Sequence, residues 1–232
     1  MKVKICGITN LVDALDAVEA GADMLGFILY PPSPRSISPE ALREITAVLR
    51  QRPNCPQLVG VFVNETAVQI AAILAQCQLD LAQLSGEEVP KWIGDEQSPI
   101  YGRAYKALRP ISFAEAEADA DWYLPPAFSK NPPQRYPDQP AILIDTYHPM
   151  LCGGTGETGN WELSAELAQS IPHLMLAGGL TPDNVAAAVQ AVRPYAVDVA
   201  SGVEASPGKK DYAKVRAFIA NAKKSSMDNR QL

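Results

Sequence analysis

The sequence has no apolar run long enough to cross a membrane and no cluster of basic residues. No uncharged apolar stretch reaches the roughly 18 residues that a bilayer-spanning helix needs, and Lys and Arg occur singly or in short pairs. The net charge is −6 at pH 7, so we expect neither nucleic acid nor an anionic membrane as a partner. The first residues also lack the pattern of a secretory signal, and we expect a cytoplasmic location.

Residues that commonly hold metal ions are scarce and scattered. The four cysteines show neither CxxC nor CxxH spacing, and the two histidines, His148 and His173, are isolated. The sequence therefore predicts no metal site and no disulfide framework, and we interpret the cysteines as free thiols.

What the sequence does contain is a regular alternation of short strands and helices. Strands are predicted at residues 2–6, 24–29, 58–63, 79–84, 101–107, 141–145, 173–177 and 195–200. Eight strands that alternate with helices predict a parallel sheet. A closed (β/α)8 TIM barrel is favoured over an open doubly wound sheet, because an open dinucleotide-binding sheet would carry GxGxxG in its first turn. That turn reads Cys6-Gly7-Ile8-Thr9 instead.

Capping residues predict where several helices begin. Ser38-Pro39-Glu40 has a cap, a proline and an acid in the order typical of a helix start, and Thr181-Pro182 predicts another start. Asn64 is expected to cap the helix that reaches Ala75. Further helices are expected at residues 86–92, 112–118 and 210–223.

The length of 232 residues suits a single barrel domain, which typically has about 250 residues. We assign residues 1–224 to the barrel and 225–232 to a polar C-terminal tail. Residues 121–140 contain six prolines and predict a surface insertion, although Trp122-Tyr123-Leu124 could form a short strand. The loop at 146–160 contains Gly153 to Gly156 and is interpreted as a lid, because it lacks the lysine of a phosphate-binding P-loop.

A candidate phosphate site lies late in the sequence. Gly178 and Gly179 follow an apolar strand and precede a helix, and paired glycines let backbone N–H groups approach an anion closely. Ser201 and Gly202 form a second small-residue turn after the next strand. The loops after strands seven and eight of a (β/α)8 barrel frequently bind phosphate, so we expect these four residues to do so.

Two residues at predicted strand ends could act as an acid and a base. Cys6 ends the first strand and Asp145 the sixth, and barrel enzymes place their active sites at the C-terminal strand ends. Each residue also has a structural interpretation, Cys6 as a small buried residue and Asp145 as a loop cap.

Other polar residues near these strand ends are Arg35, Gln83, Ser85 and Asp198. Asp198 could simply pair with Lys4 inside the barrel, and Arg35 could be a solvated loop residue.

The sequence resembles the phosphoribosylanthranilate isomerase family over nearly its whole length. Five motifs carry the resemblance, in the order found in the family: KICGIT at 4–9, PPSPRSISPE at 31–40, LIDTY with GGTG within 143–156, LAGGLTPDNV at 176–185 and DVASGVEASPGKKD at 198–211. The resemblance implies a (β/α)8 barrel of tryptophan biosynthesis. Such an enzyme catalyses the Amadori rearrangement of N-(5-phosphoribosyl)anthranilate to 1-(2-carboxyphenylamino)-1-deoxyribulose 5-phosphate, without a metal or an organic cofactor.

The resemblance also implies roles for individual residues. Cys6 would be the general base and Asp145 the general acid. Arg35 would hold the anthranilate carboxylate of a small phosphorylated substrate, and Asp198 would lie near its amine. The phosphate would bind at Gly178, Gly179, Ser201 and Gly202. A monomer and a homodimer remain alternatives.

Three features depart from the pattern of the family. Ser85 stands where the family usually has histidine, residues 156–161 read GETGNW in place of GKTFDW, and the insertion at 121–140 is longer than the family norm.

The acid and base assignment requires unusual protonation. In model peptides Asp ionises near pH 3.9 and Cys near pH 8.5, so both groups would hold the wrong state at neutral pH. With those values only about one molecule in 10⁴ to 10⁵ would combine a protonated Asp with an ionised Cys. We expect strand-end N–H groups or a cationic intermediate to lower the pKa of Cys6.

Two other functions remain open. Another sugar-phosphate barrel enzyme, such as an epimerase, would use a different acid and base, and a metal-dependent epimerase needs histidine ligands that this chain lacks. A non-catalytic sugar-phosphate-binding barrel would not need both Cys6 and Asp145.

Overall fold

The computed structural model of the chain describes residues 1–110, 112–124, 138–145 and 161–228. They form a closed barrel in which eight parallel strands follow one another in sequence order, as predicted. The strands are β1 Lys2–Cys6, β2 Met24–Ile28, β3 Gln57–Phe62, β4 Leu81–Leu84, β5 Ala104–Leu108, β6 Ile142–Asp145, β7 Leu174–Ala177 and β8 Ala196–Val199.

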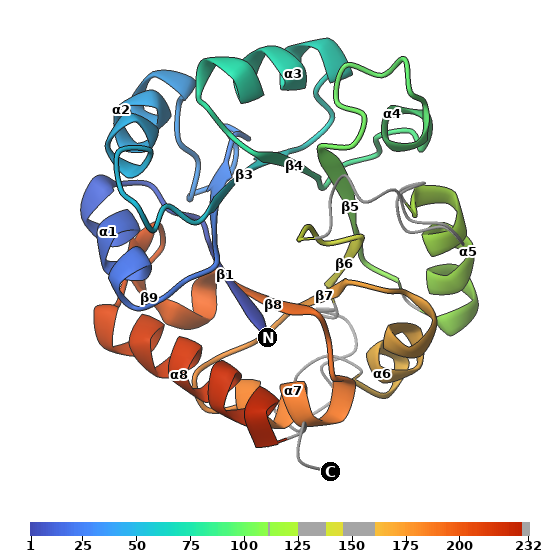
Figure 1. Cartoon of the computed structure of the whole chain (residues 1–232). Helices are drawn as coiled ribbons and strands as arrows, with labels where there is room; N and C mark the ends of the chain where they lie inside the picture. Colours follow the sequence, from blue (N-terminus) through green and yellow to red (C-terminus); the bar gives the residue numbers. More distant parts are fainter. Residues whose placement is uncertain (111, 125–137, 146–160, 229–232) are drawn as a thin grey trace.

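The α-helices form a ring around the outside of this barrel (Figure 1). They are α1 Leu11–Glu19, α2 Pro39–Leu49, α3 Ala67–Gln76, α4 Lys91–Gly94, α5 Phe113–Tyr123, α6 Trp161–Ser170, α7 Val185–Val192 and α8 Tyr212–Asp228. A 3-10 helix at Ser201–Val203 follows β8, and a small hairpin, β9 Glu204–Ser206 and β10 Lys209–Lys210, leads into α8.

The capping predictions were right for α2 and wrong for α3. The side chain of Ser38 accepts a hydrogen bond at the start of α2, whereas the residue that caps α3 is Thr66. Asn64 instead has a left-handed backbone, with φ of 59°, and its side chain accepts a hydrogen bond from the backbone N–H of Glu87 at 2.6 Å. Asn64 therefore joins the loops after β3 and β4, which competes with a role as a cap.

The predicted start of α7 at Thr181-Pro182 is also wrong. The helix begins at Val185, and Asn184 precedes it as the cap residue. The Oδ1 of Asn184 accepts a hydrogen bond from the backbone N–H of Thr181 at 2.8 Å. This turn takes up the residues that the sequence pattern assigned to the helix.

Other helix limits differ from the predictions. The helix α4 lies at Lys91–Gly94 rather than at 86–92, and Lys210 lies in a strand rather than at the start of the last helix. That helix, α8, continues to Asp228, so the residues 225–228 of the expected tail are helical. Trp122 and Tyr123 end α5 and do not form a strand. Residues 125–137 of the expected insertion and the expected lid at 146–160 lie outside the described residues, and the division into barrel, insertion and tail stays a prediction.

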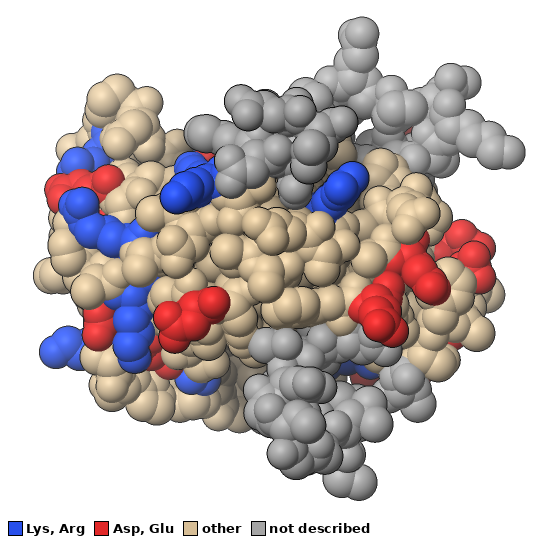
Figure 2. All heavy atoms as spheres, turned by 90° about the horizontal axis from the view of Figure 1, so that it is seen from below, with Lys and Arg blue, Asp and Glu red and all other residues tan. Residues whose placement is uncertain are grey.

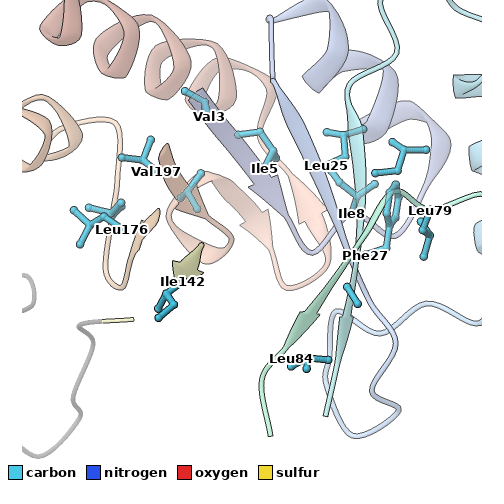
Figure 3. Close-up of a cluster of buried hydrophobic side chains, with 14 of the residues drawn as sticks. Val3, Ile5, Ile8, Leu25, Phe27, Leu79, Leu84, Ile142, Leu176 and Val197 are labelled. Atoms are coloured by element: carbon cyan, nitrogen blue, oxygen red, sulfur yellow. The ribbon is translucent and has the colours of Figure 1, made fainter. Parts of the chain in front are cut away.

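Apolar side chains form two cores, one on each side of the strands. The larger core fills the space between the barrel and the helices, and Figure 3 shows part of it, including Ile5, Phe27 and Leu176. The smaller core fills the barrel interior with Met24, Val59, Leu81, Tyr105, Leu143, Met175, Ala177 and Ala196. Since successive residues of a strand face opposite sides, these two cores identify which residues point into the barrel.

On β1 the residues that point inward are Lys4 and Cys6. A Cβ atom at Gly26, the partner of Cys6 on β2, would lie 2.6 Å from Cys6 Sγ and 3.0 Å from Lys4 Cε. Gly26 thus leaves the space that both side chains occupy. The interior is apolar over much of its depth, but Lys4, Gln83 and Asp198 form a polar group inside it.

The described surface carries charges of both signs. On the face shown in Figure 2, the described Lys and Arg side chains lie among Asp and Glu and form no continuous basic patch. Among the described helices, none combines the length and the apolar character needed to cross a membrane.

Phe218 tests how much the barrel depends on α8. This side chain is fully buried, and Phe218→Ala should lower the free energy of unfolding by about 3–5 kcal/mol, because it leaves a cavity in a packed core. Urea unfolding of the variant measures this. Phe113→Ala is the matched control, since Phe113 is 37% exposed and should lose much less. Equal losses in the two variants would contradict the packing described for α8.

Candidate active site

The two candidate catalysts lie at the same end of the barrel. Cys6 is the last residue of β1 and Asp145 the last residue of β6, and both share the inward-facing alternation of their strands. All eight strands are parallel, so these C-terminal ends form one rim. Cys6 is buried, with 5% of its surface exposed, whereas 27% of the Asp145 side chain is exposed. The rim positions expected from the sequence are confirmed.

Asp145 lies beside the first of the two glycine turns. Its register partner on β7 is Ala177, the residue before Gly178. Gly178 and Gly179 have φ angles of 99° and 62°, a backbone conformation that residues with a Cβ atom rarely adopt. The glycines are therefore required for the shape of this turn.

The second turn packs directly against the first. A Cβ atom at Gly202 would lie 1.9 Å from the backbone oxygen of Leu180, so only glycine allows this contact. The carbonyl of Gly179 accepts a hydrogen bond from Asn184 Nδ2 at 3.0 Å. Gly179 and Ser201 are both exposed. Two fixed turns and the start of α7 thus lie side by side at the rim, which is an arrangement suited to an anion.

Arg35 is held by the hairpin that follows β8. Its Nε donates to Glu204 Oε1 at 2.9 Å and its Nη2 donates to Oε2 at 2.8 Å. Lys210 Nζ also donates to Glu204 Oε1, at 3.1 Å. Burial acts to raise the pKa of Glu204, but hydrogen bonds from Arg35 and Lys210 outweigh it and hold this pKa below its usual value. Arg35 is therefore a fixed, paired residue and not a solvated loop residue.

The pairing with Glu204 leaves one edge of the Arg35 guanidinium available. A guanidinium has five N–H groups, and the bonds to Glu204 use the edge formed by Nε and Nη2. Among the described residues the structure gives the Arg35 guanidinium no acceptor besides Glu204. The stem of Arg35 crosses Gly7, where a Cβ atom would lie 3.0 Å from Arg35 Cδ. Arg35 can bind a second carboxylate through its Nη1 side.

An ion pair between Lys4 and Asp198 lies inside the barrel, as the simpler interpretation of Asp198 predicted. The two residues are register partners on β1 and β8, and Lys4 Nζ lies 3.1 Å from Asp198 Oδ1. Lys4 Nζ donates to Gln83 Oε1 at 2.7 Å. Asp198 Oδ1 is buried, and within the described residues the ion pair with Lys4 is its polar contact. Burial raises the pKa of Asp198, and Lys4 opposes this rise.

The expected lowering of the Cys6 pKa is wrong for the free protein. Burial raises the pKa of the Cys6 thiol, because the interior disfavours a charged sulfur, and the charge of Lys4 is the largest effect in the opposite direction. Sequence reasoning predicted N–H groups or a cationic intermediate as the source of positive charge and did not weigh the burial of the thiol.

Several residues near the site were missed in the sequence. Arg109, which follows β5, has its Nε 3.4 Å from Asp145 Oδ2, and Glu204 and Lys210 were assigned no role. The rule that the strand ends form the site could have identified Arg109. Nothing in the sequence pattern indicated that Glu204 pairs with Arg35, 169 positions away. The described residues contain no group of His, Cys, Asp and Glu that could hold a metal ion.

Comparisons with known proteins agree on one family. A family model described as N-(5'phosphoribosyl)anthranilate (PRA) isomerase matches residues 3–221. The N-(5'-phosphoribosyl)anthranilate isomerase of Trichlorobacter lovleyi is 45% identical over 225 residues, which cover 97% of this chain and 99% of that protein.

Solved structures give the same result. The crystal structure of phosphoribosyl anthranilate isomerase from Thermotoga maritima has a TM-score of 0.80 and 41% identity, over 97% of this chain and 99% of that chain. Another phosphoribosyl anthranilate isomerase, solved in complex with reduced 1-(o-carboxyphenylamino)-1-deoxyribulose 5-phosphate, has a TM-score of 0.75 and 38% identity, over the same shares of the two chains.

The contact at Gly202 provides a test of the anion site. We predict that Gly202→Ala weakens the binding of inorganic phosphate about tenfold or more, because the added Cβ forces the two turns apart at a cost of about 1–3 kcal/mol. Titration calorimetry measures this affinity. Gly94→Ala is the control, since a Cβ there meets nothing within 4 Å, and it should leave the affinity unchanged. Unaltered phosphate binding in a folded Gly202→Ala would remove these turns from the site.

Proposed function

The chain belongs to the N-(5'-phosphoribosyl)anthranilate isomerase family, and from this premise we propose which residues perform the reaction. The protein is an isomerase of tryptophan biosynthesis that converts N-(5-phosphoribosyl)anthranilate to 1-(2-carboxyphenylamino)-1-deoxyribulose 5-phosphate. In the proposal Asp145 is the general acid and Cys6 is the general base. The ligand is a small phosphorylated molecule, and a cytoplasmic location is part of the proposal.

The reaction needs one proton donated to the ring oxygen and one removed from C2′, the two atoms that flank C1′ in the ring. Asp145 donates a proton to the ring oxygen, and the ribose ring opens to a Schiff base between its C1′ atom and the anthranilate nitrogen. The Schiff base acidifies the proton on C2′, and Cys6 removes it as a thiolate. The enolamine that results then tautomerises to the ketone. No external oxidant or reductant is needed, because C2′ is oxidised while C1′ is reduced, and the hydrogen lost from C2′ is balanced by the one gained at C1′.

One observation carries this assignment. Cys6 and Asp145 are the last residues of two strands, their side chains point inward at one rim, and they lie on opposite sides of the Asp198 carboxylate. The strand β8, with Asp198, lies between β1 and the pair β6 and β7 in the closed barrel. Asp198 acts electrostatically on Cys6, and Asp145 acts on Asp198. A substrate over β8 would therefore have the base on one side and the acid on the other.

Asp198 suits the substrate amine for a separate reason. Among the described residues the ion pair with Lys4 Nζ, at 3.1 Å, is the polar contact of its buried Oδ1, and a carboxylate oxygen can accept more than one donor. The anthranilate N–H would be a second donor to this oxygen. We place the amine at this oxygen, with the phosphate at the turns formed by Gly178, Gly179, Ser201 and Gly202.

The anthranilate carboxylate is assigned to Arg35. Glu204 occupies the Nε edge of the guanidinium and fixes its plane, so a second carboxylate would meet a preorganised donor on the Nη1 side. Binding at both ends of the substrate would hold the reacting carbons between the two catalysts, and such positioning contributes much of the rate in enzymes of this kind.

The roles of the two catalysts can be separated by pH. Productive molecules need an ionised Cys6 together with a protonated Asp145, so the alkaline inflection in kcat/KM belongs to the thiol, whose pKa burial raises. We predict that Cys6→Ser loses this inflection, because a serine hydroxyl does not titrate there, and that it keeps weak activity. Asp145→Asn should lose roughly 10³-fold or more, because an amide cannot donate the proton. Steady-state turnover across the pH range measures both effects.

The result that would end the assignment is simple to obtain. If folded Cys6→Ala retains turnover within a few-fold of the parent, the thiol only packs against Gly26 and the base lies elsewhere.

Arg35 gives a second prediction at the other end of the substrate. Arg35→Ala should weaken substrate binding by about 1.5–3 kcal/mol, the usual value of a charged hydrogen bond. Arg35→Lys should recover only part of the loss, because the planar fork is gone. Inhibition by inorganic phosphate is the internal control and should change little. An equal loss of phosphate inhibition would mean that Arg35 contacts the phosphate end instead.

A further inference from the structure

Lys4 is a buried cation on the same strand face as the proposed base. It lies two residues before Cys6 on β1 and has no exposed surface. Both side chains fill the space above Gly26, where a Cβ atom would meet Cys6 Sγ at 2.6 Å and Lys4 Cε at 3.0 Å. The ammonium stem and the thiol are therefore packed together over one glycine.

The partners of Lys4 hold its ammonium in place without using all its donors. An ammonium has three N–H groups, of which one is directed at Gln83 Oε1 at 2.7 Å. Tyr105 OH donates to the same oxygen at 3.0 Å, and Gln83 Nε2 donates onward to Ser85 Oγ at 3.1 Å. Asp198 Oδ1 lies 3.1 Å from Nζ and forms an ion pair with it. Gln83 thus fixes the ammonium between a carboxylate and the thiol.

Other charged or titratable groups act on Cys6 from several elements. Lys210 on β10 and Arg35 in the loop after β2 are cations, but Glu204 forms ion pairs with both of them. Asp198 on β8 is the anion that faces Cys6, and the hydroxyl of Tyr105 on β5 is neutral. Asp145 on β6 acts on Asp198 and is paired with Arg109. Lys4 is therefore the cation with the largest effect on the thiol.

We propose that Lys4 is a positioning residue for the reaction, a fixed counter-ion that stabilises the thiolate of Cys6 while Gln83 and Asp198 hold the ammonium in place. The inference rests on the proposed role of Cys6 as the base. It gives the Lys4–Asp198 pair a function beyond filling the barrel interior. Replacing either residue of the pair with an apolar residue of equal volume should then change how readily Cys6 ionises.

The charged form of Lys4 is favoured inside the barrel. Burial is the largest single effect and acts to lower the pKa of Lys4, but the charge of Asp198, together with Cys6, Tyr105 and a hydrogen bond to Asp198, raises this pKa above its usual value. For Cys6, burial raises the pKa and Lys4 opposes that rise. Removing the cation should therefore raise the thiol pKa further, by about 1–3 pH units, which is the usual effect of one close charge.

The direct test is a titration of the thiol in the free enzyme. The ultraviolet absorbance of the thiolate is followed against pH in the parent and in Lys4→Met, and the same titration of the corresponding Cys6→Ser protein is subtracted to isolate Cys6. Lys4→Met should raise the Cys6 pKa by about 1–3 pH units. Lys4→Arg keeps the charge, so its Cys6 pKa should lie close to that of the parent.

Lys106→Met is the matched control. Lys106, on β5, is the second buried lysine in a strand of the barrel, 4% exposed, with its Nζ 2.7 Å from Glu88 Oε2. It faces outward, away from Cys6, because it follows the inward-facing Tyr105. Both variants break a buried ion pair and should lose stability, but only Lys4→Met should raise the pKa of Cys6. Equal shifts in the two variants, or none in Lys4→Met, would overturn the inference.

A double variant covers the case in which Lys4→Met does not fold. Lys4→Met/Asp198→Asn removes both charges of the pair and leaves no buried charge unmatched. Its thiol pKa should lie about 1–3 pH units above that of Asp198→Asn alone, and identical values would overturn the inference.

Turnover distinguishes this inference from the proposed function. At a pH between the two inflections, the fraction of molecules with ionised Cys6 and protonated Asp145 falls tenfold for each unit by which the thiol pKa rises. Lys4→Met should therefore lower kcat/KM by about 10- to 10³-fold and shift the alkaline inflection upward. A shifted thiol titration with unchanged turnover would leave Lys4 as the counter-ion and remove Cys6 from the chemistry. An unshifted titration would refute the role of Lys4 whatever Cys6 does.

Discussion

The alternation of side chains along β1 is the constraint on which the site depends. Val3 and Ile5 pack outward against the helices, and this packing turns Lys4 and Cys6 into the barrel. A register shift of one residue would reverse every side chain of the strand, placing isoleucine at the rim and burying an ammonium among apolar side chains. The outer core therefore determines where the thiol points. Closure of the barrel then brings β8 and β2 to either side of it.

Burying polar groups inside the barrel lowers stability, and pairing between opposite charges offsets this loss. Breaking a buried ion pair costs about 3–5 kcal/mol, so Lys4 and Asp198 are retained together at adjacent register positions. Farther out, Glu204 joins Arg35 and Lys210 into one network. The two networks have different consequences. The outer one fixes the direction of a ligand-binding guanidinium, while the inner one controls how readily a buried thiol ionises.

Much of this arrangement was predictable from the sequence, because it follows from local patterns. The order of the strands and the glycine turn at Gly178 come from short-range periodicity and backbone requirements, and the rim positions of Cys6 and Asp145 follow from the barrel. The strand limits were less accurate, since β4 begins at Leu81 rather than at 79 and β5 at Ala104 rather than at 101. The failures have tertiary causes. Asn64 bridges two loops instead of capping a helix, and burial, which a sequence pattern does not quantify, raises the pKa of Cys6. The ion pair of Arg35 with Glu204 joins distant segments of the chain, and no spacing rule reveals such a contact.

The central claim is that Cys6 and Asp145 address two neighbouring parts of one ribose, on either side of Asp198. A crystal structure with reduced 1-(o-carboxyphenylamino)-1-deoxyribulose 5-phosphate, the ligand seen in a related isomerase, tests it most directly. We expect Cys6 Sγ within about 3–3.5 Å of C2′, Asp145 on the opposite side of the sugar, and the anilino nitrogen at Asp198 Oδ1. The phosphate should lie at the glycine turns and the carboxylate at Arg35. A ligand bound in the reverse direction, or a thiol turned away from C2′, would contradict the account.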